Sequence, residues 1–458
     1  MSEHGAISKI NLQERICTFK EVSRGFDEAE ALKEAGRCLQ CANAPCSKGC
    51  PAGIDIKEFI HLIRGKKYLQ SLAKIRESNS LPAVCGRVCP QEEQCQAACI
   101  LIKKNDPIQI GYLERFVADA EIASGMVALK LDLAANGIKV AVIGTGPAGL
   151  TCAGDLAKAG FDVYLFEALH KTGGVLAYGI PEFRLPKNIV AHEVEYLKRL
   201  GAKVECNFVA GRTQTLDDLR KAGFKAFFIG VGAGLPQFLN VPGENLNGVY
   251  SANEFLTRVN LMKGYAFPEY DTPVKVGRRV GVFGAGNVAF DSARCALRLG
   301  AREVSIIYRR TFNEMPARKE EVENAREEGI KFHLLTSPKE IFSDNNGNVK
   351  GVICLKNELG APDQSGRSSP VAIAGSDFGI ELDTVIVAVG TSANPLLISS
   401  IAGLKLNKRG YIEVNEHMQS SINDIFAAGD IVSGSATVIS AINQARLAAA
   451  AIIKKFGG

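Results

Sequence analysis

The chain has 458 residues, of which 46% are hydrophobic and 22% are charged, and its formal net charge is +5. A chain of this length is too long for one compact core, so we expect roughly two to four domains. The small net charge gives no reason to expect nucleic acid or a membrane surface as a partner, and no apolar stretch is long enough to span a bilayer. Residues 1–11 show no secretory signal, so we expect a cytoplasmic protein.

The first part of the chain, residues 1–135, has the apolar spacing of helices at 27–37, 54–62 and 110–123. Most of the thirteen cysteines lie here, close together in two groups. Cysteine this dense in a reducing compartment indicates a metal site rather than disulfides. The grouped cysteines are Cys38, Cys41, Cys46, Cys50, Cys85, Cys89, Cys95 and Cys99.

The spacings of these cysteines are typical of iron–sulfur ligation. The first group has the pattern Cys-x2-Cys-x4-Cys-x3-Cys-Pro, and the second has Cys-x3-Cys-Pro-x4-Cys-x3-Cys. Short spacings with a Cys-Pro pair occur in ferredoxin-type 4Fe–4S proteins, where the last cysteine of a run often ligates the other cluster. The order of the cysteines therefore need not give the ligand sets. Zinc is the main alternative, because zinc sites built from four cysteines also use short spacings.

A parallel sheet is predicted from residue 138 onward. A buried strand at 139–143 precedes a glycine turn, a helix at 150–159 and a second strand at 161–166 that closes on Glu167. This pattern predicts a dinucleotide site, in which the helix N-terminus faces the pyrophosphate and the acid accepts hydrogen bonds from a ribose. The turn consists of Gly144, Thr145, Gly146, Pro147, Ala148 and Gly149.

The same pattern returns with strands at 279–283 and 304–308, which indicates an internal duplication. The second strand here ends in Arg309 and Arg310, and guanidinium groups pair with a 2′-phosphate that a carboxylate would repel. The pattern therefore favours NADP(H) over NAD(H). The alternative is that the two arginines form a solvated strand end. The second turn consists of Gly284, Ala285, Gly286, Asn287, Val288 and Ala289.

Two dinucleotide sites in one chain indicate a flavoprotein, with one site for FAD and the other presenting a nicotinamide to the flavin. A strand at 425–430 ends in Asp430, and a helix that starts at Thr437 would place its N-terminus beside the reduced flavin. Neither unit carries the close cysteine pair of a disulfide reductase, so we expect electrons to leave through metal. Hydride transfer to flavin needs placement rather than a protein acid or base, so no catalytic side chain is predicted.

Four segments resemble the small (β) subunit of NADPH-dependent glutamate synthase and its relatives, and the resemblance covers essentially the whole chain. The relatives include the large subunit of NADH-dependent reduced ferredoxin:NADP oxidoreductase, the branch that this sequence resembles most, and the N-terminal half of dihydropyrimidine dehydrogenase. The segments are Cys38–Cys41, Asn79–Pro90, Gly179–Lys187 and Tyr308–Arg310.

The resemblance implies an α/β fold class, with a helical iron–sulfur domain followed by two Rossmann-like dinucleotide-binding domains, as in disulfide-reductase-like flavoproteins. The implied domains are 1–135 with two 4Fe–4S clusters, 136–270 as the first part of the FAD-binding domain, 271–381 as the NADP(H)-binding domain, and 382–458 as the rest of the FAD-binding domain.

The resemblance also implies ligand sets that interleave along the sequence. In the family, a segment like 110–116 supplies a non-cysteine ligand, which puts Glu114 in that role and leaves Cys85 over. One cluster would be held by Cys38, Cys41, Cys46 and Cys99, and the other by Cys50, Cys89, Cys95 and Glu114. FAD would contact Gly144, Gly146, Pro147, Ala148, Gly149, Glu167, Gly174, Asp430, Thr437 and Val438. NADPH would contact Gly284, Gly286, Asn287, Val288, Arg309 and Arg310.

The activity implied by the resemblance is reversible hydride transfer between NADPH and FAD, with one-electron steps through the clusters. The electrons would reach a ferredoxin or a second flavin or iron–sulfur subunit, so we expect a hetero-oligomer. In the ferredoxin:NADP branch, the flavin divides an electron pair between two acceptors, which is electron bifurcation. The alternatives are a glutamate synthase small subunit supplying electrons for glutamate formation from glutamine and 2-oxoglutarate, a disulfide reductase, or a redox-sensing module.

Overall fold

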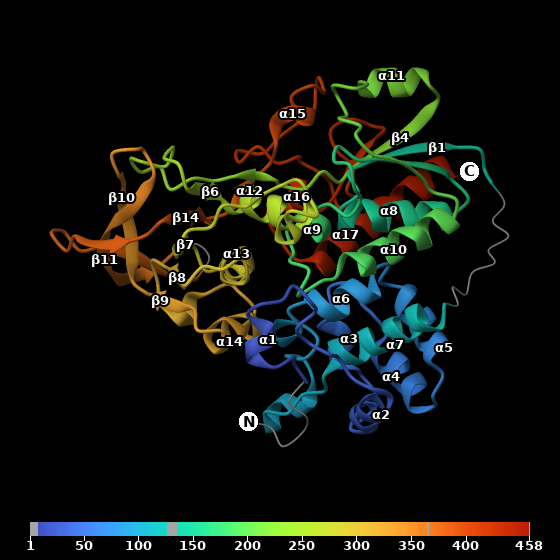
Figure 1. Ribbon diagram of the computed structural model, residues 1–458. Helices are drawn as coiled ribbons and strands as arrows, with labels where there is room; N and C mark the ends of the chain where they lie inside the picture. Colours follow the sequence, from blue (N-terminus) through green and yellow to red (C-terminus); the bar gives the residue numbers. More distant parts are fainter. Residues whose placement is uncertain (1–7, 126–134, 364–365, 458) are drawn as a thin grey trace.

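The computed structural model describes residues 8–125, 135–363 and 366–457. Its N-terminal part is helical and lies against two separate parallel sheets, one at the upper right and one at the left of Figure 1. Asp55 accepts a hydrogen bond from the Glu58 N–H at 3.2 Å and so caps α4, which is why the helix predicted at 54–62 begins at Ile56. The helical elements are α1 Leu12–Arg15, α2 Glu28–Gly36, α3 Pro45–Lys48, α4 Ile56–Arg64, α5 Tyr68–Arg76, α6 Pro82–Val88, η1 Gln91–Glu93, η2 Ile100–Lys104 and α7 Ile110–Ser124.

The core of the helical part is built on the buried face of α4. Ile56, Phe59, Ile60 and Ile63 recur at helical spacing, and each is at most 2% exposed. Burying one such side chain stabilises the fold by about 1.5–3 kcal/mol. The cysteines lie on the short helices and loops around this core, so the core fixes their positions.

The first parallel sheet has the strand order β16-β4-β1-β2-β3. Val140 and Val142 on β1 face a core shared with α8, α10 and α17, whereas Ala141 and Ile143 face the opposite layer. Within the described ranges, no helix is long and apolar enough to cross a lipid bilayer. The elements are β1 Lys139–Ile143, α8 Pro147–Lys158, β2 Asp162–Phe166, α9 Val175–Tyr178, α10 Lys187–Arg199, β3 Lys203–Glu205, α11 Leu216–Lys221, β4 Phe224–Ile229, α15 Pro395–Ile398, β16 Ile425–Ala427, α16 Asp430–Ser433 and α17 Val438–Phe456.

The second parallel sheet repeats the first, with the order β6-β14-β7-β8-β9. The chain leaves the first sheet after β4 and rejoins it at β16, so the second sheet is inserted between them, and an antiparallel sheet extends from it at the left of Figure 1. The elements are β5 Leu235–Pro236, β6 Val249–Ser251, α12 Ala252–Leu256, η3 Thr257–Leu261, η4 Gly264–Ala266, β7 Arg279–Phe283, α13 Asn287–Arg298, β8 Glu303–Ile307, η5 Phe312–Glu314, α14 Lys319–Glu327, β9 Lys331–His333, β10 Thr336–Ser343, β11 Val349–Pro362, β12 Ser368–Ala372, β13 Phe378–Glu381, β14 Thr384–Val387 and β15 Thr391–Ser392.

Two predicted strands end earlier than expected, those at 304–308 and 425–430, whereas the strand predicted at 161–166 ends at Phe166 as expected. The strand predicted at 425–430 ends at Ala427, because Gly429 turns the chain with φ +80°, and Asp430 therefore opens the short helix α16. Glu167 and Arg309 likewise follow β2 and β8 rather than closing them. These side chains lie beyond the carboxyl ends of the strands, which is where open α/β sheets bind ligands.

The segment 8–24, which we call the N-terminal strap, ties the two sheets together. Its Val22 N–H donates to the Phe183 carbonyl of the first sheet's domain at 2.9 Å. At the other end, Lys9 Nζ donates to Asn324 Oδ1 on α14 at 2.7 Å. The strap therefore links elements that the sequence places far apart.

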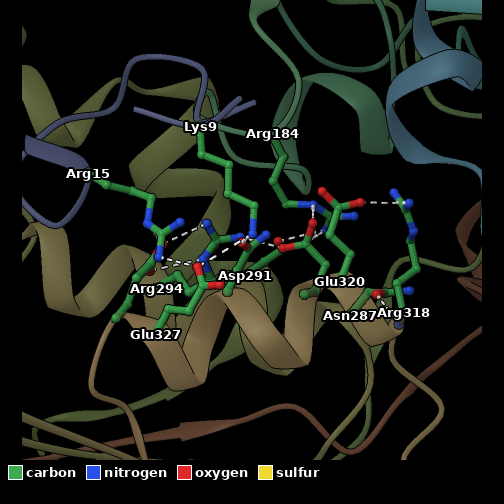
Figure 2. A network of polar contacts seen from close by, with 12 residues as sticks. Lys9, Arg15, Arg184, Asn287, Asp291, Arg294, Arg318, Glu320 and Glu327 are labelled. Atoms are coloured by element: carbon green, nitrogen blue, oxygen red, sulfur yellow. Dashed lines mark hydrogen bonds and ion pairs between the residues drawn. The ribbon is translucent and has the colours of Figure 1, made fainter. Parts of the chain in front are cut away.

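A buried ion network lies under the strap (Figure 2). Arg294 has no exposed surface, and it donates to Glu328 at 2.8 and 3.0 Å and also to Glu321. Arg298 donates to Glu328 at 2.8 Å, and Arg15 of the strap approaches Glu328 at 3.2 Å. The strap, α13 and the end of α14 therefore meet on one carboxylate.

Replacing Glu328 with glutamine is expected to lower the free energy of unfolding by about 3–5 kcal/mol, because buried guanidiniums would lose their counter-charge. Burial alone would raise the pKa of Glu328, but the charges and hydrogen bonds of Arg294 and Arg298 outweigh it and lower the pKa from 4.5 to about 2. The stabilising contribution is complete above pH 4.5 and is lost as the pH falls towards 2. Urea unfolding at neutral pH and near pH 3 measures both effects.

Glu327 provides a matched control on the same helix. Its side chain is 50% exposed, and it contacts Lys9 and the buried Arg15, which keeps Glu328 as a second partner. Glu327→Gln should therefore lower the free energy of unfolding by less than about 1 kcal/mol. Equal losses for the two variants would contradict the role given to the buried network.

Candidate functional site

The loop after β1 leaves open space in front of α8. An added Cβ at Gly149 would lie 1.8 Å from the Gly144 carbonyl oxygen, so this close approach requires glycine. At Gly146, the N-cap of α8, nothing lies within 4 Å of the Cβ position, and Pro147 opens the helix. The first-turn N–H groups of α8 can therefore face a pyrophosphate.

Glu167 lies beside this loop and is 6% exposed. Its carboxylate accepts hydrogen bonds from the Thr145 N–H at 3.0 Å, from the Thr145 hydroxyl, and from the Leu169 N–H at 2.9 Å. Gly174 approaches the same loop, because a Cβ there would lie 2.8 Å from the Gly146 Cα. Glu167 therefore holds the loop in shape.

The segment 429–438, near the end of the chain, lies beside the same glycine turn. Asp430 accepts a hydrogen bond from the Ala436 N–H at 3.1 Å, and burial raises the pKa of its carboxyl to about 6. Thr437 caps α17 by accepting from the Ser440 N–H at 3.2 Å, and Val438 opens the helix. Ala148 meets this segment, because a Cβ at Gly429 would lie 3.2 Å from its Cβ.

Tyr178, which the sequence patterns did not predict, lies near both Asp430 and Glu167. Burial, and then the charges of Asp430 and Glu167, raise the pKa of its phenol to about 12. Tyr178, Asp430 and Glu167 therefore lie near one another at the carboxyl edge of the first sheet. Tyr178 directly precedes the segment Gly179–Lys187, and this position is the one sequence signal that could have identified Tyr178.

The second glycine turn has the same geometry. A Cβ at Gly284 would lie 2.2 Å from the Ala388 carbonyl oxygen, whereas the nearest atom to a Cβ at Gly286 is Pro316 Cγ at 3.9 Å. Gly286 caps α13, Asn287 opens it, and Val288 is 42% exposed. A second open helix N-terminus therefore lies at the edge of the second sheet.

The two arginines after β8 differ in their surroundings. Arg310 is 3% exposed, and it donates to the Ser368 carbonyl at 2.7 Å and to Asp363 Oδ2 at 2.5 Å. Its charge is thus matched by a carboxylate at the end of β11. Arg309 is exposed to solvent. The structure therefore leaves Arg309 more available than Arg310 to meet a phosphate.

Four of the cysteines line one cavity, which we call the outer thiol group: Cys38, Cys41, Cys46 and Cys99. The rest of the wall is largely apolar and includes Ile56 and Ile60. Burial, followed by the charges of neighbouring thiols, raises the pKa of Cys46 to about 11. Soft thiolate donors around one apolar cavity fit a 4Fe–4S cluster.

The other ligand candidates form a second cluster of side chains, which we call the inner thiol group: Cys50, Cys89, Cys95 and Glu114. Burial, followed by the charges of Cys89, Glu114 and Cys50, raises the pKa of Cys95. Glu114 is 6% exposed, and its one hydrogen bond from a side chain comes from Asn79 at 2.7 Å among the described residues. Burial raises the pKa of Glu114 to about 8, so this carboxylate lacks a cationic partner in the described part of the protein.

Cys85 lies next to the inner thiol group. It is fully buried on α6, with its Sγ 3.6 Å from Asn79 Oδ1, and its pKa is raised by burial and then by Cys89. Among the described residues, no three His, Cys, Asp or Glu side chains stand where they could hold a single metal ion. A 4Fe–4S cluster, unlike a single ion, takes its ligands on separate iron atoms.

Arg318 connects the second glycine turn to the helices that carry the cysteines, and no sequence motif signalled it. Its backbone N–H donates to Asn287 Oδ1 at 3.1 Å. Its guanidinium donates to the Arg87 carbonyl at 3.0 Å and to Gln91 Oε1 at 3.1 Å, and Figure 2 shows it beside Asn287. The second sheet is thereby held against α6 and η1.

Two family models match the chain. Residues 15–126 match dihydropyrimidine dehydrogenase domain II, 4Fe-4S cluster. Residues 138–445 match pyridine nucleotide-disulphide oxidoreductase. The first match covers both thiol groups, and the second covers both glycine turns.

The chain is 39% identical over 457 residues to the NADP(+)-dependent formate dehydrogenase subunit beta of Moorella thermoacetica. This alignment covers 94% of the present chain but only 62% of the Moorella protein. The chain is 35% identical over 448 residues to the glutamate synthase [NADPH] small chain of Escherichia coli, covering 96% of this chain and 95% of that one. Among solved structures, Mycobacterium tuberculosis FprA in complex with NADPH is similar in fold, with a TM-score of 0.59 and 23% identity over 70% of this chain and 85% of that one. These likenesses confirm the predicted fold class.

Proposed function

The chain belongs to the pyridine nucleotide-disulphide oxidoreductase family, as an NADPH-dependent FAD and iron–sulfur oxidoreductase similar to the glutamate synthase small chains, and from this premise we propose that it passes electrons between NADPH and a protein partner. Bound FAD would exchange hydride with the nicotinamide on one side and single electrons with the clusters on the other. Two of the relatives are a formate dehydrogenase subunit beta and a glutamate synthase small chain, which supports a redox partner.

The observation that carries the proposal is that α6, whose C-cap is Cys89 of the inner thiol group, contacts the domains of both glycine turns. Helix α6 meets α10 of the first sheet's domain, where Ala83 N–H donates to Glu193 at 3.0 Å. Arg318 joins the same helix to the second turn. These contacts join the domains of both glycine turns to the helical part that carries both thiol groups.

We assign two clusters, because the candidate ligands fall into two groups in space and the resemblance implies the same two ligand sets. The outer thiol group would hold one 4Fe–4S cluster, and the inner thiol group would hold the other, with Glu114 as the fourth ligand and Cys85 beside it. FAD would lie against the first turn with Glu167, Gly174, Asp430 and Thr437, and NADPH against the second. The proposed domains are those expected above: 1–135, 136–270, 271–381 and 382–458.

Anaerobic purification of the full chain, followed by cofactor analysis and titration with NADPH and with NADH, tests the proposal. The expected protein contains FAD and iron with acid-labile sulfide, and NADPH bleaches its flavin rapidly. A colourless protein that contains zinc would overturn the proposal. Subunits that copurify would identify the partner.

Arg309→Ser is expected to raise the KM for NADPH by about tenfold to a hundredfold and to leave the KM for NADH nearly unchanged, because the guanidinium would pair with the 2′-phosphate that NADH lacks. Steady-state reduction of an artificial acceptor measures both constants. Asp363→Asn is the companion variant, because it would remove the carboxylate that pairs with Arg310 and lower the KM for NADPH. Equal effects of Arg309→Ser on both nucleotides would contradict this assignment.

Glutamate synthesis is the second candidate, favoured by the 35% identity over nearly the full length of a glutamate synthase small chain. Adding a glutamate synthase large chain, glutamine and 2-oxoglutarate tests it directly. Electron bifurcation belongs to the ferredoxin:NADP branch, and it would require NADPH oxidation to depend on ferredoxin and NAD+ together. Oxidation that proceeds fully with ferredoxin alone would exclude it.

A further inference from the structure

We propose that the surface over the outer thiol group, which we call the carrier face, is the docking site for an acidic one-electron carrier protein. The inference rests on the proposed function, because it needs a redox centre behind that surface. It goes further by naming where the partner binds and which charge the partner carries. The carrier face consists of Leu39, Ile100, Ile102, Lys48, Lys57, Lys103 and Lys104.

The centre of the carrier face is apolar. Leu39 is 59% exposed and Ile100 is 42% exposed, and both also line the cavity of the outer thiol group. Ile102, 40% exposed, lies in the same 3-10 helix as Ile100. Large apolar side chains scattered singly on a surface need no explanation, but here two line one cavity and a third follows in the same short helix, a grouping that is typical of an interaction site.

The loop that carries Leu39 is fixed in this outward arrangement. Gln40 adopts φ +51°, and its side-chain amide donates to the Lys57 carbonyl at 3.3 Å and to Cys38 Sγ at 3.4 Å. Gln40 thus ties this loop to Lys57 on α4, while Leu39 stays exposed. An anchored apolar side chain loses little entropy when a partner covers it.

The rim of the carrier face is positive. Lys103 and Lys104 follow Ile102 directly, Lys48 ends α3 beside Cys46, and Lys57 lines the cavity. Lys48, Lys103 and Lys104 are exposed, Lys57 is partly exposed, and none of the four forms an ion pair with another residue in the part of the chain that the structure describes. Unpaired positive charges around an apolar centre steer a negatively charged partner and fix its orientation.

The two thiol groups differ in depth, which explains why a carrier should bind here. The cysteines of the outer thiol group are all partly exposed, whereas Cys50, Cys89 and Cys95 of the inner thiol group are buried. Electron transfer between proteins slows steeply with distance, so a carrier gains most by sitting over the shallower group. A small interface with a charged rim is typical of transient redox encounters.

The test uses the full chain, purified anaerobically with its cofactors, and an acidic two-[4Fe–4S] ferredoxin as the probe. Lys103→Glu/Lys104→Glu should weaken ferredoxin binding by about tenfold or more at low salt and should reduce its salt dependence. Ile102→Ser should weaken binding by a few fold. The matched control is Lys405→Glu/Lys408→Glu, two exposed lysines on the first sheet's domain, which should bind like wild type. Calorimetry and stopped-flow association measure these effects.

Iron content and flavin reduction by NADPH are measured on every variant, so that the two proposals can fail separately. If NADPH does not reduce the flavin of the wild-type chain, the proposed function is wrong. If NADPH reduces the flavin but both lysine pairs change ferredoxin binding equally, or neither changes it, the carrier face is wrong. Cross-links from ferredoxin carboxylates to Lys103 or Lys104 would support it, and cross-links confined to the other domains would overturn it.

Discussion

Cys50→Ala is expected to remove about half of the iron and to slow electron delivery to ferredoxin by about 100-fold or more, while NADPH still bleaches the flavin. Cys50 is 9% exposed and belongs to the inner thiol group, so alanine leaves that cluster one ligand short. Mutating a residue that only contacts a metal ligand already lowers metal affinity or activity roughly ten- to a hundredfold, and loss of the ligand itself should lower them further. Iron and flavin analysis with stopped-flow reduction separates the two half-reactions.

Cys85→Ala is the matched control for this prediction. Cys85 is as deeply buried as the ligands and lies beside Cys89, but it is not among the assigned ligands. The variant should keep its iron and lose only about 1–2 kcal/mol of stability from the lost packing. Loss of iron from Cys85→Ala with full retention in Glu114→Gln would reverse the assignment of the fourth ligand.

The features that the sequence could predict are those set by local chemistry. The turns at Gly144–Gly149 and Gly284–Ala289 were found because close backbone approach and an open helix N-terminus restrict residue type over a few consecutive positions. The strand–helix–strand units around them were found by the same local patterns. The cysteines were conspicuous for their density, but the ligand sets came from resemblance. Spacing alone left them open, because Cys99 lies in space with Cys38 rather than with Cys95.

The features that the sequence could not predict depend on residues distant in the chain. Arg310 follows Arg309 directly, yet its partner Asp363 comes from a hairpin strand 53 positions later, so nothing local distinguishes the two arginines. Arg318 joins the second turn to Gln91, 227 positions away. The N-terminal strap showed no motif, since its role lies in bonds to Phe183 and α14. Such contacts follow from the packing of whole domains.

The glycine turns allow a sharper separation between damage to the protein and damage to its ligand sites. Gly149→Ala would place a Cβ 1.8 Å from the Gly144 carbonyl oxygen, and because the backbone fixes the positions of both atoms, no side-chain rotation can relieve the clash. The variant should lose about 1–3 kcal/mol of stability and nearly all of its FAD. Thermal unfolding and flavin absorbance measure the two losses.

Gly146→Ala should lose FAD while keeping its stability within about 0.5 kcal/mol, because nothing in the described part of the protein lies within 4 Å of the added methyl group. The methyl group would instead occupy the place where backbone and pyrophosphate approach each other. Gly286→Ala, which is almost as open, should keep its flavin and iron but no longer be reduced by NADPH. If Gly146→Ala kept its FAD, or if Gly286→Ala lost flavin instead of NADPH reduction, the assignment of the two turns would be wrong, even though the fold around each glycine would be undisturbed.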